Sequence, residues 1–137
     1  MICLAFNDTF RFGAHAIILN SNGQTLLLKR TYGDKGWSFP GGSVEPGETI
    51  HQALHRECLE ELGIDVRDVV LTGFYYHSKY NSQAAIFRCS IPEEMEITLN
   101  YEHSEFRWMH LSELSETHRI RVLDALEFNG QVTSRAF

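Results

Sequence analysis

The segment from residue 41 to residue 64, GGSVEPGETIHQALHRECLEELGI, limits the possible folds of this chain more than any other segment. Thr49 followed three residues later by Gln52 is a capping-box pattern, and apolar residues then recur at helical spacing until Gly63. These signals predict a helix from about Thr49 to Leu62. Any fold of the chain must therefore place a glycine-rich loop directly before this helix.

Three carboxylates share one side of the predicted helix, because Glu57, Glu60 and Glu61 stand at positions i, i+3 and i+4. At about 6 Å and an effective dielectric constant near 20, each ionised pair repels by about 3 kcal/mol. A solvated helix face is one explanation of such a charge run. The glycine-rich loop favours another, since backbone carbonyls and carboxylate oxygens together form a site for Mg²⁺ or Mn²⁺.

The same segment resembles the Nudix box, in which Gly, Glu, Arg-Glu, Glu-Glu and a final Gly recur at fixed spacing. The residues in register with it are Gly42, Glu48, Arg56, Glu57, Glu60, Glu61, Gly63 and Ile64. Cys58 occupies an apolar position of the motif, a departure that a small buried thiol tolerates. The chain is therefore identified as a member of the Nudix hydrolase (MutT-like) family, with its box at residues 42–64.

This resemblance implies an α/β fold, the Nudix α/β/α sandwich around a mixed β-sheet, with residues 1–137 forming one domain. It also implies a metal-dependent pyrophosphohydrolase that cleaves a nucleoside diphosphate linked to another moiety. Nucleoside triphosphates and dinucleoside polyphosphates are the leading substrates. The alternative is a nucleotide-binding Nudix sensor domain without catalysis, which is disfavoured because this box keeps every carboxylate. RNA 5′-end hydrolysis fits the acidic charge of the chain poorly.

The resemblance also assigns roles within the box. Glu57 and Glu61 are expected as the main Mg²⁺ ligands, with Mn²⁺ possible, and Glu60 as a further ligand or as the base that deprotonates water. The residues expected to support the box are Gly42, Glu48 and Gly63. Arg56 also belongs to the expected catalytic set. Its guanidinium should form a forked pair of hydrogen bonds with the carboxylate of Glu48. The carbonyl of Gly41 resembles an additional metal ligand.

A further acidic residue is expected outside the box. Family members often carry one in a loop shortly before a strand that contains Trp, and Glu102 stands six residues before Trp108. Glu102 is therefore expected as an additional metal ligand or catalytic base, with Glu105 as the nearer alternative. The identity of the base stays open among Glu60, Glu102 and Glu105.

The rest of the chain reads as strands and a closing helix. Phe12–Asn20 and Thr25–Arg30 predict an antiparallel hairpin, because a turn cluster separates two β-forming runs. Glycine and proline crowd residues 33–47 and predict a long loop. The remaining predictions are strands at Val66–His77, Gln83–Ile91 and 105–111 and a helix at His118–Phe128.

Composition excludes several classes of partner. The formal charge of −6 and the lack of a Lys/Arg stripe argue against long nucleic acid. No apolar run approaches the roughly 20 residues of a membrane span. The three cysteines lack the spacing of a disulfide framework, and the opening MICLAF lacks the basic start of a signal peptide. A small nucleotide in a cytoplasmic setting is the expected context.

No motif in the sequence marks the substrate-binding residues, the bond cleaved or the oligomeric state. Aromatic candidates for contact with a base are Trp37, Phe39 and Tyr80, for which core packing is the alternative role. Basic candidates for contact with phosphates are Lys29, Arg30, Lys35 and Lys79, for which an ordinary surface charge is the alternative.

Overall fold

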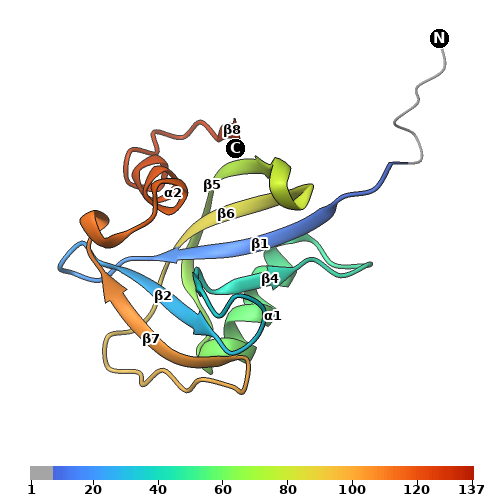
Figure 1. Cartoon of the computed structure of the whole chain (residues 1–137). Coiled ribbons are helices and arrows are strands. Elements are labelled where there is room, and N and C mark those ends of the chain that lie inside the picture. The colour runs from blue at the N-terminus through green and yellow to red at the C-terminus, as the bar shows by residue number, and fades with distance from the viewer. Residues whose placement is uncertain (1–7) are drawn as a thin grey trace, which may run out of the picture.

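The computed structural model describes residues 8–137, which form two sheets and two main helices (Figure 1). The strands are β1 (Arg11–Ile18), β2 (Thr25–Arg30), β3 (Trp37–Ser38), β4 (Gly41–Ser43), β5 (Arg67–His77), β6 (Ser82–Ser90), β7 (His103–Met109) and β8 (Thr133–Ala136). The helices are α1 (Ile50–Leu62) and α2 (Glu116–Leu126), with short 3-10 turns η2 (Ser78–Tyr80) and η3 (Leu111–Glu113).

The larger sheet is mixed and has five strands in the order β4-β1-β6-β5-β8. Strand β1 runs parallel to β6 and antiparallel to β4, and β5 runs antiparallel to β6 and parallel to β8. The smaller sheet is antiparallel, in the order β3-β2-β7. The predicted mixed sheet is therefore confirmed.

Helices α1 and α2 cover opposite faces of the larger sheet. Successive strand residues point to opposite faces, so β1 contributes Ala14 and Ala16 to the core under α1 and Ile17 to the core under α2. Leu54 of α1 packs in the first core and Val122 of α2 in the second. This arrangement is the α/β/α sandwich that the sequence predicted.

Helix α1 begins and ends as predicted. The Thr49 hydroxyl accepts a hydrogen bond from the Gln52 N–H at 3.1 Å, and the Gln52 side chain accepts one from the Thr49 N–H at 2.9 Å. At the other end Gly63 has φ 70°, and its N–H donates to the Leu59 carbonyl. Left-handed φ favours glycine, so the last box glycine serves as the helix cap.

The predicted hairpin of residues 12–20 and 25–30 is wrong. Both strands exist, but they belong to different sheets and meet at a bridge between Leu19 and Thr25. The reason is burial: Leu26 and Leu28 pack in the core under α1, whereas Leu27 packs in the core under α2. Strand β2 thus contributes side chains to both cores, and it pairs with β3 and β7 rather than with β1.

Three further differences concern segment ends and short strands. The predicted loop at 33–47 contains the short strands β3 and β4, and β8 was not predicted. Helix α2 begins at Glu116, before the predicted start at His118, because Ser115 caps it. The strands predicted at 66–77, 83–91 and 105–111 are confirmed as β5, β6 and β7, with shifted ends.

Cys58 and Cys89 are buried free thiols, and Cys3 lies with the opening segment outside the described residues. No helix within residues 8–137 combines the length and apolar character needed to span a membrane.

Candidate active site

Strand β4 places glycine backbone directly against α1. Gly41 and Gly42 pair with His15 and Ala14 of β1. A Cβ atom on Gly42 would lie 2.6 Å from the Glu57 carboxyl carbon, and Gly41, at φ 139°, has room for none because the Ala14 carbonyl would be 2.2 Å away. Only glycine allows this close approach of strand and carboxylate.

Glu61 is buried beneath this glycine pair, with a relative exposure of 2%. Its carboxylate accepts a hydrogen bond from the Gly41 N–H at 2.9 Å. Burial raises the pKa of Glu61 to about 8, and the negative charges of Glu57 and Glu102 act in the same direction. Burial also raises the pKa of Glu57, against the opposing effect of Arg56. Both carboxyl groups thus lack a full counter-charge.

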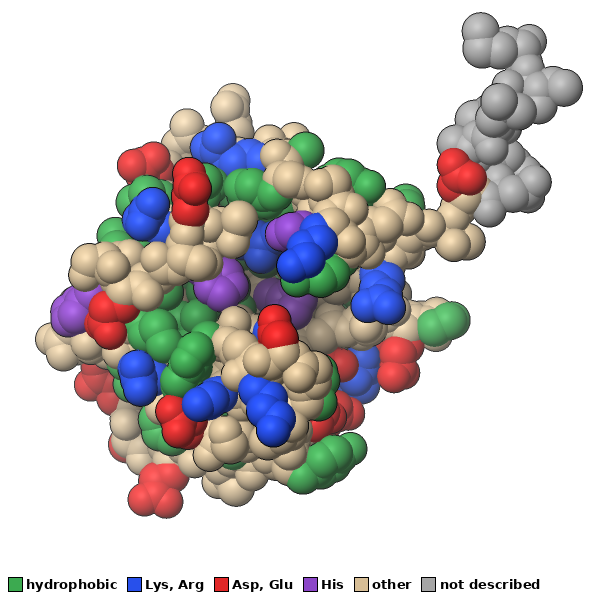
Figure 2. All heavy atoms as spheres, viewed as in Figure 1, with side chains coloured by type: hydrophobic (Ala, Val, Ile, Leu, Met, Phe, Trp, Pro, Cys, Tyr) green, Lys and Arg blue, Asp and Glu red, His purple; other side chains and the backbone are tan. Residues whose placement is uncertain are grey.

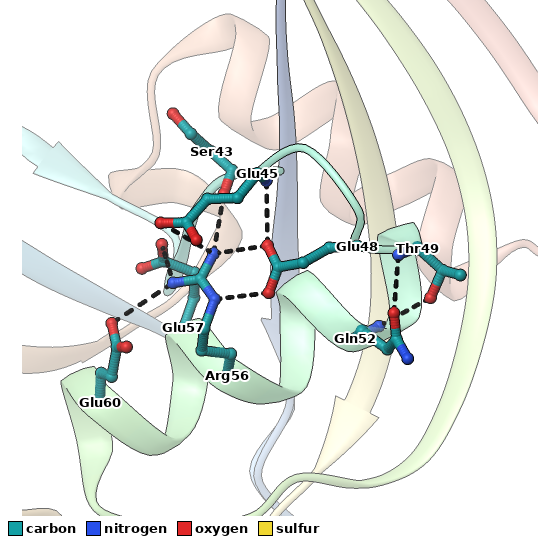
Figure 3. Close-up of polar contacts among 8 residues, drawn as sticks. All are labelled: Ser43, Glu45, Glu48, Thr49, Gln52, Arg56, Glu57 and Glu60. Atoms are coloured by element: carbon teal, nitrogen blue, oxygen red, sulfur yellow. Dashed lines mark hydrogen bonds and ion pairs between the residues drawn. The ribbon is translucent and has the colours of Figure 1, made fainter.

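Arg56 joins the loop to the helix, as Figure 3 shows. Its Nε donates to Glu48 Oε2 at 2.6 Å and its Nη2 to Glu48 Oε1 at 2.8 Å, which is the expected fork. Nη2 also donates to the Ser43 carbonyl at 3.1 Å. The bonds from Arg56 lower the pKa of Glu48 to about 2. The loop before α1 is therefore held by one guanidinium.

The three box carboxylates differ in their surroundings. Glu57 accepts a hydrogen bond from Arg56 at 2.9 Å, and Glu60 lies 3.5 Å from the same guanidinium (Figure 3). The Glu60 side chain is half exposed, at 51%, whereas that of Glu57 is largely buried, at 14%. Glu57 and Glu61 therefore form the enclosed part of the site, and Glu60 forms its solvent side.

Across residues 8–137, no three His, Cys, Asp or Glu side chains are already gathered as a metal site. Arg56 and the Gly41 N–H engage Glu57 and Glu61 instead. The donor set nevertheless fits Mg²⁺ or Mn²⁺, because it consists of hard carboxylate oxygens beside glycine backbone. Burial of Glu57 and Glu61 strengthens this fit, since a bound cation would stabilise their ionised forms.

Of the two later acidic candidates, the structure brings Glu102 toward the box. The charge of Glu102 acts on both Glu57 and Glu61. Its carbonyl accepts a hydrogen bond from the Thr31 N–H at 2.9 Å, which fixes the segment before β7. Glu105 is half exposed on β7, with Arg107 at 3.9 Å.

A cavity of about 300 Å³ lies between the larger sheet and α2. Four substrate candidates named from the sequence line it: Arg30, Trp37, Phe39 and Tyr80. Lys29, Lys35 and Lys79 are not among its lining residues. Neither this cavity nor a larger one of about 690 Å³, between β7 and residues 90–97, is lined by a residue of the box. Volume alone therefore does not mark the site.

Sequence reasoning missed four further residues that line the 300 Å³ cavity: His15, His77, His118 and Arg121. They come from β1, β5 and α2, and no spacing in the sequence connects them. The only sequence feature that these four residues share is a basic or imidazole side chain near a predicted strand or helix. Many other residues have this feature, so it does not distinguish these four.

Comparison with known proteins identifies the family of the chain. The NUDIX domain family matches residues 9–128. An RNA pyrophosphohydrolase of Hamiltonella defensa is 40% identical over 75 residues, which are 54% of this chain and 45% of that protein. One from Serratia proteamaculans is 43% identical over 63 residues, 46% of this chain and 35% of that protein. The matches thus span less than half the length of these relatives.

Solved structures share the fold at lower identity. An ADP-ribose pyrophosphatase from Streptococcus suis superposes with a TM-score of 0.75 at 19% identity, covering 94% of this chain and all (100%) of that chain. An Ap4A hydrolase from C. elegans superposes with a TM-score of 0.71 at 21% identity, covering 86% of this chain and 96% of that chain. Fold, box geometry and a family match over residues 9–128 together lead to one assignment. This chain belongs to the NUDIX domain family.

Proposed function

We propose that this chain is a Mg²⁺- or Mn²⁺-dependent pyrophosphohydrolase of a nucleoside diphosphate derivative, with nucleoside triphosphates and dinucleoside polyphosphates as the leading substrates. The burial of Glu57 and Glu61 against the glycines of β4 carries this proposal. A buried pair of carboxylates needs a counter-charge, and Nudix proteins generally use divalent metal ions.

Each residue of the candidate site has a separate role in the proposed reaction. Glu57, Glu60, Glu61, Glu102 and the Gly41 carbonyl are the proposed metal ligands. When bound, the divalent ion supplies positive charge that offsets the diphosphate oxygens. Either Glu102 or the solvent-side Glu60 accepts a proton from the water that attacks phosphorus, and the bridging anhydride oxygen leaves.

Arg56 has a positioning role in this scheme. It donates to Glu48 of the loop and to Glu57 of the helix, so it sets the distance between β4 and the carboxylates. Gly42 and Gly63 complete this support, since Gly42 leaves space for Glu57 and Gly63 ends α1.

The test is a product-mass screen with Mg²⁺ and with Mn²⁺. It covers nucleoside triphosphates, diadenosine polyphosphates, ADP-ribose and nucleotide sugars. Wild type is compared with Glu61→Gln and with Glu94→Gln, a matched change at an exposed position. We expect turnover by wild type and Glu94→Gln but not by Glu61→Gln. If wild type and Glu61→Gln are alike throughout while nucleotides still bind, the sensor alternative replaces the hydrolase.

Hydrolysis at RNA 5′ ends is a second candidate, and the relatives named RNA pyrophosphohydrolase favour it. The net charge of −6 disfavours it, since long RNA binding normally draws on basic surface. A short RNA with a 5′-triphosphate, added to the same screen, separates the two. Faster cleavage of this RNA than of any mononucleotide would make the RNA end the substrate.

A further inference from the structure

The cavity between the larger sheet and α2 is cationic, although the protein as a whole carries a net charge of −6. Arg30 and Arg121 are among its lining residues, and no Asp or Glu is. Positive charge therefore dominates the cavity at neutral pH.

Arg121 lies in this cavity without an anionic partner. Its Nε atom is buried and has no hydrogen-bond partner among residues 8–137. None of the ion pairs within the same residues includes Arg121. The guanidinium carbon lies 5.4 Å from the Tyr75 ring centre and 5.5 Å from that of Phe137. Aromatic faces thus hold the cation in place but leave its hydrogen-bonding capacity unused.

His77, which also lines the cavity, shows the same lack of a partner. Its Nδ1 atom is buried and, in the part of the chain that the structure describes, accepts or donates no hydrogen bond. The charges of Arg121 and Lys79 both act on this ring. Buried polar atoms are normally paired, so these two nitrogen atoms mark two cavity-lining side chains whose hydrogen-bonding capacity is not fully used.

The cavity adjoins the box. His15 lines the cavity and pairs in register with Gly41, whose N–H binds Glu61. Figure 2 shows His side chains next to Lys and Arg side chains in the middle of this face, over β1. The cavity therefore begins one strand pairing away from the backbone that contacts Glu61.

We propose that this cavity binds a phosphate group of the substrate that is remote from the bond cleaved, with Arg121 as the specificity-determining residue. Arg121 donates hydrogen bonds to the phosphate oxygens, and Arg30 adds positive charge from the other wall. The inference rests on the proposed function and narrows the substrate class. It favours nucleotides with a long phosphate chain, such as dinucleoside polyphosphates, over those with a single diphosphate.

The test measures binding by calorimetry in EDTA, so that no metal ion bridges a ligand to the box. The probes are inorganic tripolyphosphate, which is purely anionic, and adenosine, which is uncharged. The proteins are wild type, Arg121→Gln and Arg67→Gln, which removes the same charge at an exposed position on β5. We expect tripolyphosphate affinity to fall about tenfold or more in Arg121→Gln, the range for lost charged hydrogen bonds, and to stay within about twofold in Arg67→Gln.

A second variant tests the same idea without changing a buried residue. Arg30 is paired with Asp34, whose side chain is 70% exposed. Asp34→Asn removes this competing carboxylate and keeps an acceptor for the Gly36 N–H. We expect tripolyphosphate to bind about twofold to threefold more tightly to this variant, with an affinity that weakens as salt is added.

Several results overturn the proposal: unchanged tripolyphosphate binding in Arg121→Gln, no gain in Asp34→Asn, or no binding to wild type. Adenosine binding that depends on Arg121 would make the cavity a nucleobase site and overturn it as well. Failure of the proposed function gives a different result, because wild type would then bind tripolyphosphate through Arg121 yet cleave nothing. Normal KM values of Arg121→Gln for every cleaved substrate would refute only the phosphate subsite.

Discussion

The box and the cavity next to it both gather like charges in a buried place, but they do so in opposite ways. The negative charges of the box stand on the single helix α1, within about one turn of each other. The positive charges of the cavity come from β2 and α2, and its histidines from β1, β5 and α2. One cluster is local in the chain, whereas the other exists only after folding.

The two clusters also differ in how far neighbouring opposite charges neutralise them. Arg56 contacts Glu48, Glu57 and Glu60 and so offsets part of the negative charge of the box. No carboxylate within residues 8–137 forms an ion pair with Arg121. Burial of like charges without full compensation opposes folding, which is the reason that we propose ligands for both regions.

The largest effect is expected for Glu61→Gln, which separates function from stability. We expect kcat to fall by about three orders of magnitude, because the variant lacks the carboxylate that we propose as a metal ligand. The metal-free variant should nevertheless be more stable than wild type at pH 8. The amide removes the buried charge and can still accept the Gly41 hydrogen bond.

The pH dependence of this gain in stability follows from the raised pKa of Glu61. Folded Glu61 keeps its proton up to about pH 8, whereas the unfolded value is 4.5. The folded state therefore binds more protons, and the stability of metal-free wild type falls as pH rises from 4.5 to about 8. Thermal unfolding in EDTA at pH 5 and pH 8 measures this. A Glu61→Gln variant that melts below wild type at pH 8 would show that Glu61 serves the fold.

Glu102→Gln should have the next largest effect, a decrease of kcat by about two orders of magnitude, as expected for loss of a general base. Steady-state kinetics with the best substrate of the screen measures it. Glu105→Gln is the matched control, because Glu105 is half exposed and faces Arg107. Near-normal turnover of Glu102→Gln would remove Glu102 from the mechanism and leave Glu60 and Glu105 as candidate bases, and turnover of Glu105→Gln then distinguishes these two.

Asp124→Asn tests the contacts that hold α2 to the larger sheet. The variant should lower the free energy of unfolding by about 2 kcal/mol. Asp124 accepts hydrogen bonds from Tyr75 Oη at 2.8 Å and from Arg135 Nε at 2.8 Å, and so ties α2 to β5 and β8. This predicted loss of stability is moderate because the Arg135 side chain is 48% exposed.

Urea unfolding measures this loss. Tyr75→Phe is the matched variant, since it removes one of these hydrogen bonds and keeps the ring, and it should cost about 1 kcal/mol. Equal stability of Asp124→Asn and wild type would mean that packing alone holds α2 to the sheet.

The smallest effect is expected for Glu48→Gln, and it depends on pH. Arg56 lowers the pKa of Glu48 from 4.5 to about 2. The pair therefore stabilises the folded state fully above pH 4.5, and this contribution is lost as pH falls toward 2. Urea unfolding should show a gap between wild type and Glu48→Gln at pH 6 that narrows at pH 3. A gap of the same size at both values would exclude the ion pair as its cause.

Much of the site was predictable because its interactions are close together in the chain. The capping box of Thr49 and Gln52, the cap at Gly63 and the fork from Arg56 to Glu48 all lie within residues 48–63. Local hydrogen bonds and helical periodicity depend on spacing, which a sequence displays directly. The functional roles of these residues stay proposals.

The pairing of strands was not predictable in the same way. Turn residues between Phe12–Asn20 and Thr25–Arg30 favoured a hairpin, yet β1 pairs with β4 and β6 instead. Strand partners are selected by the side chains packed on both faces, and these come from distant segments. The short strand β8 was missed for the same reason, since it gains its order from β5.

The family, the capped helix and the carboxylates on that helix were predictable from the sequence, because they follow from neighbouring residues. Folding sets which of those carboxylates is buried and which later glutamate approaches them, and it brings His15, His77 and Arg121 to one cavity. Burial and charge proximity are sums over the whole fold, and no short segment contains that information.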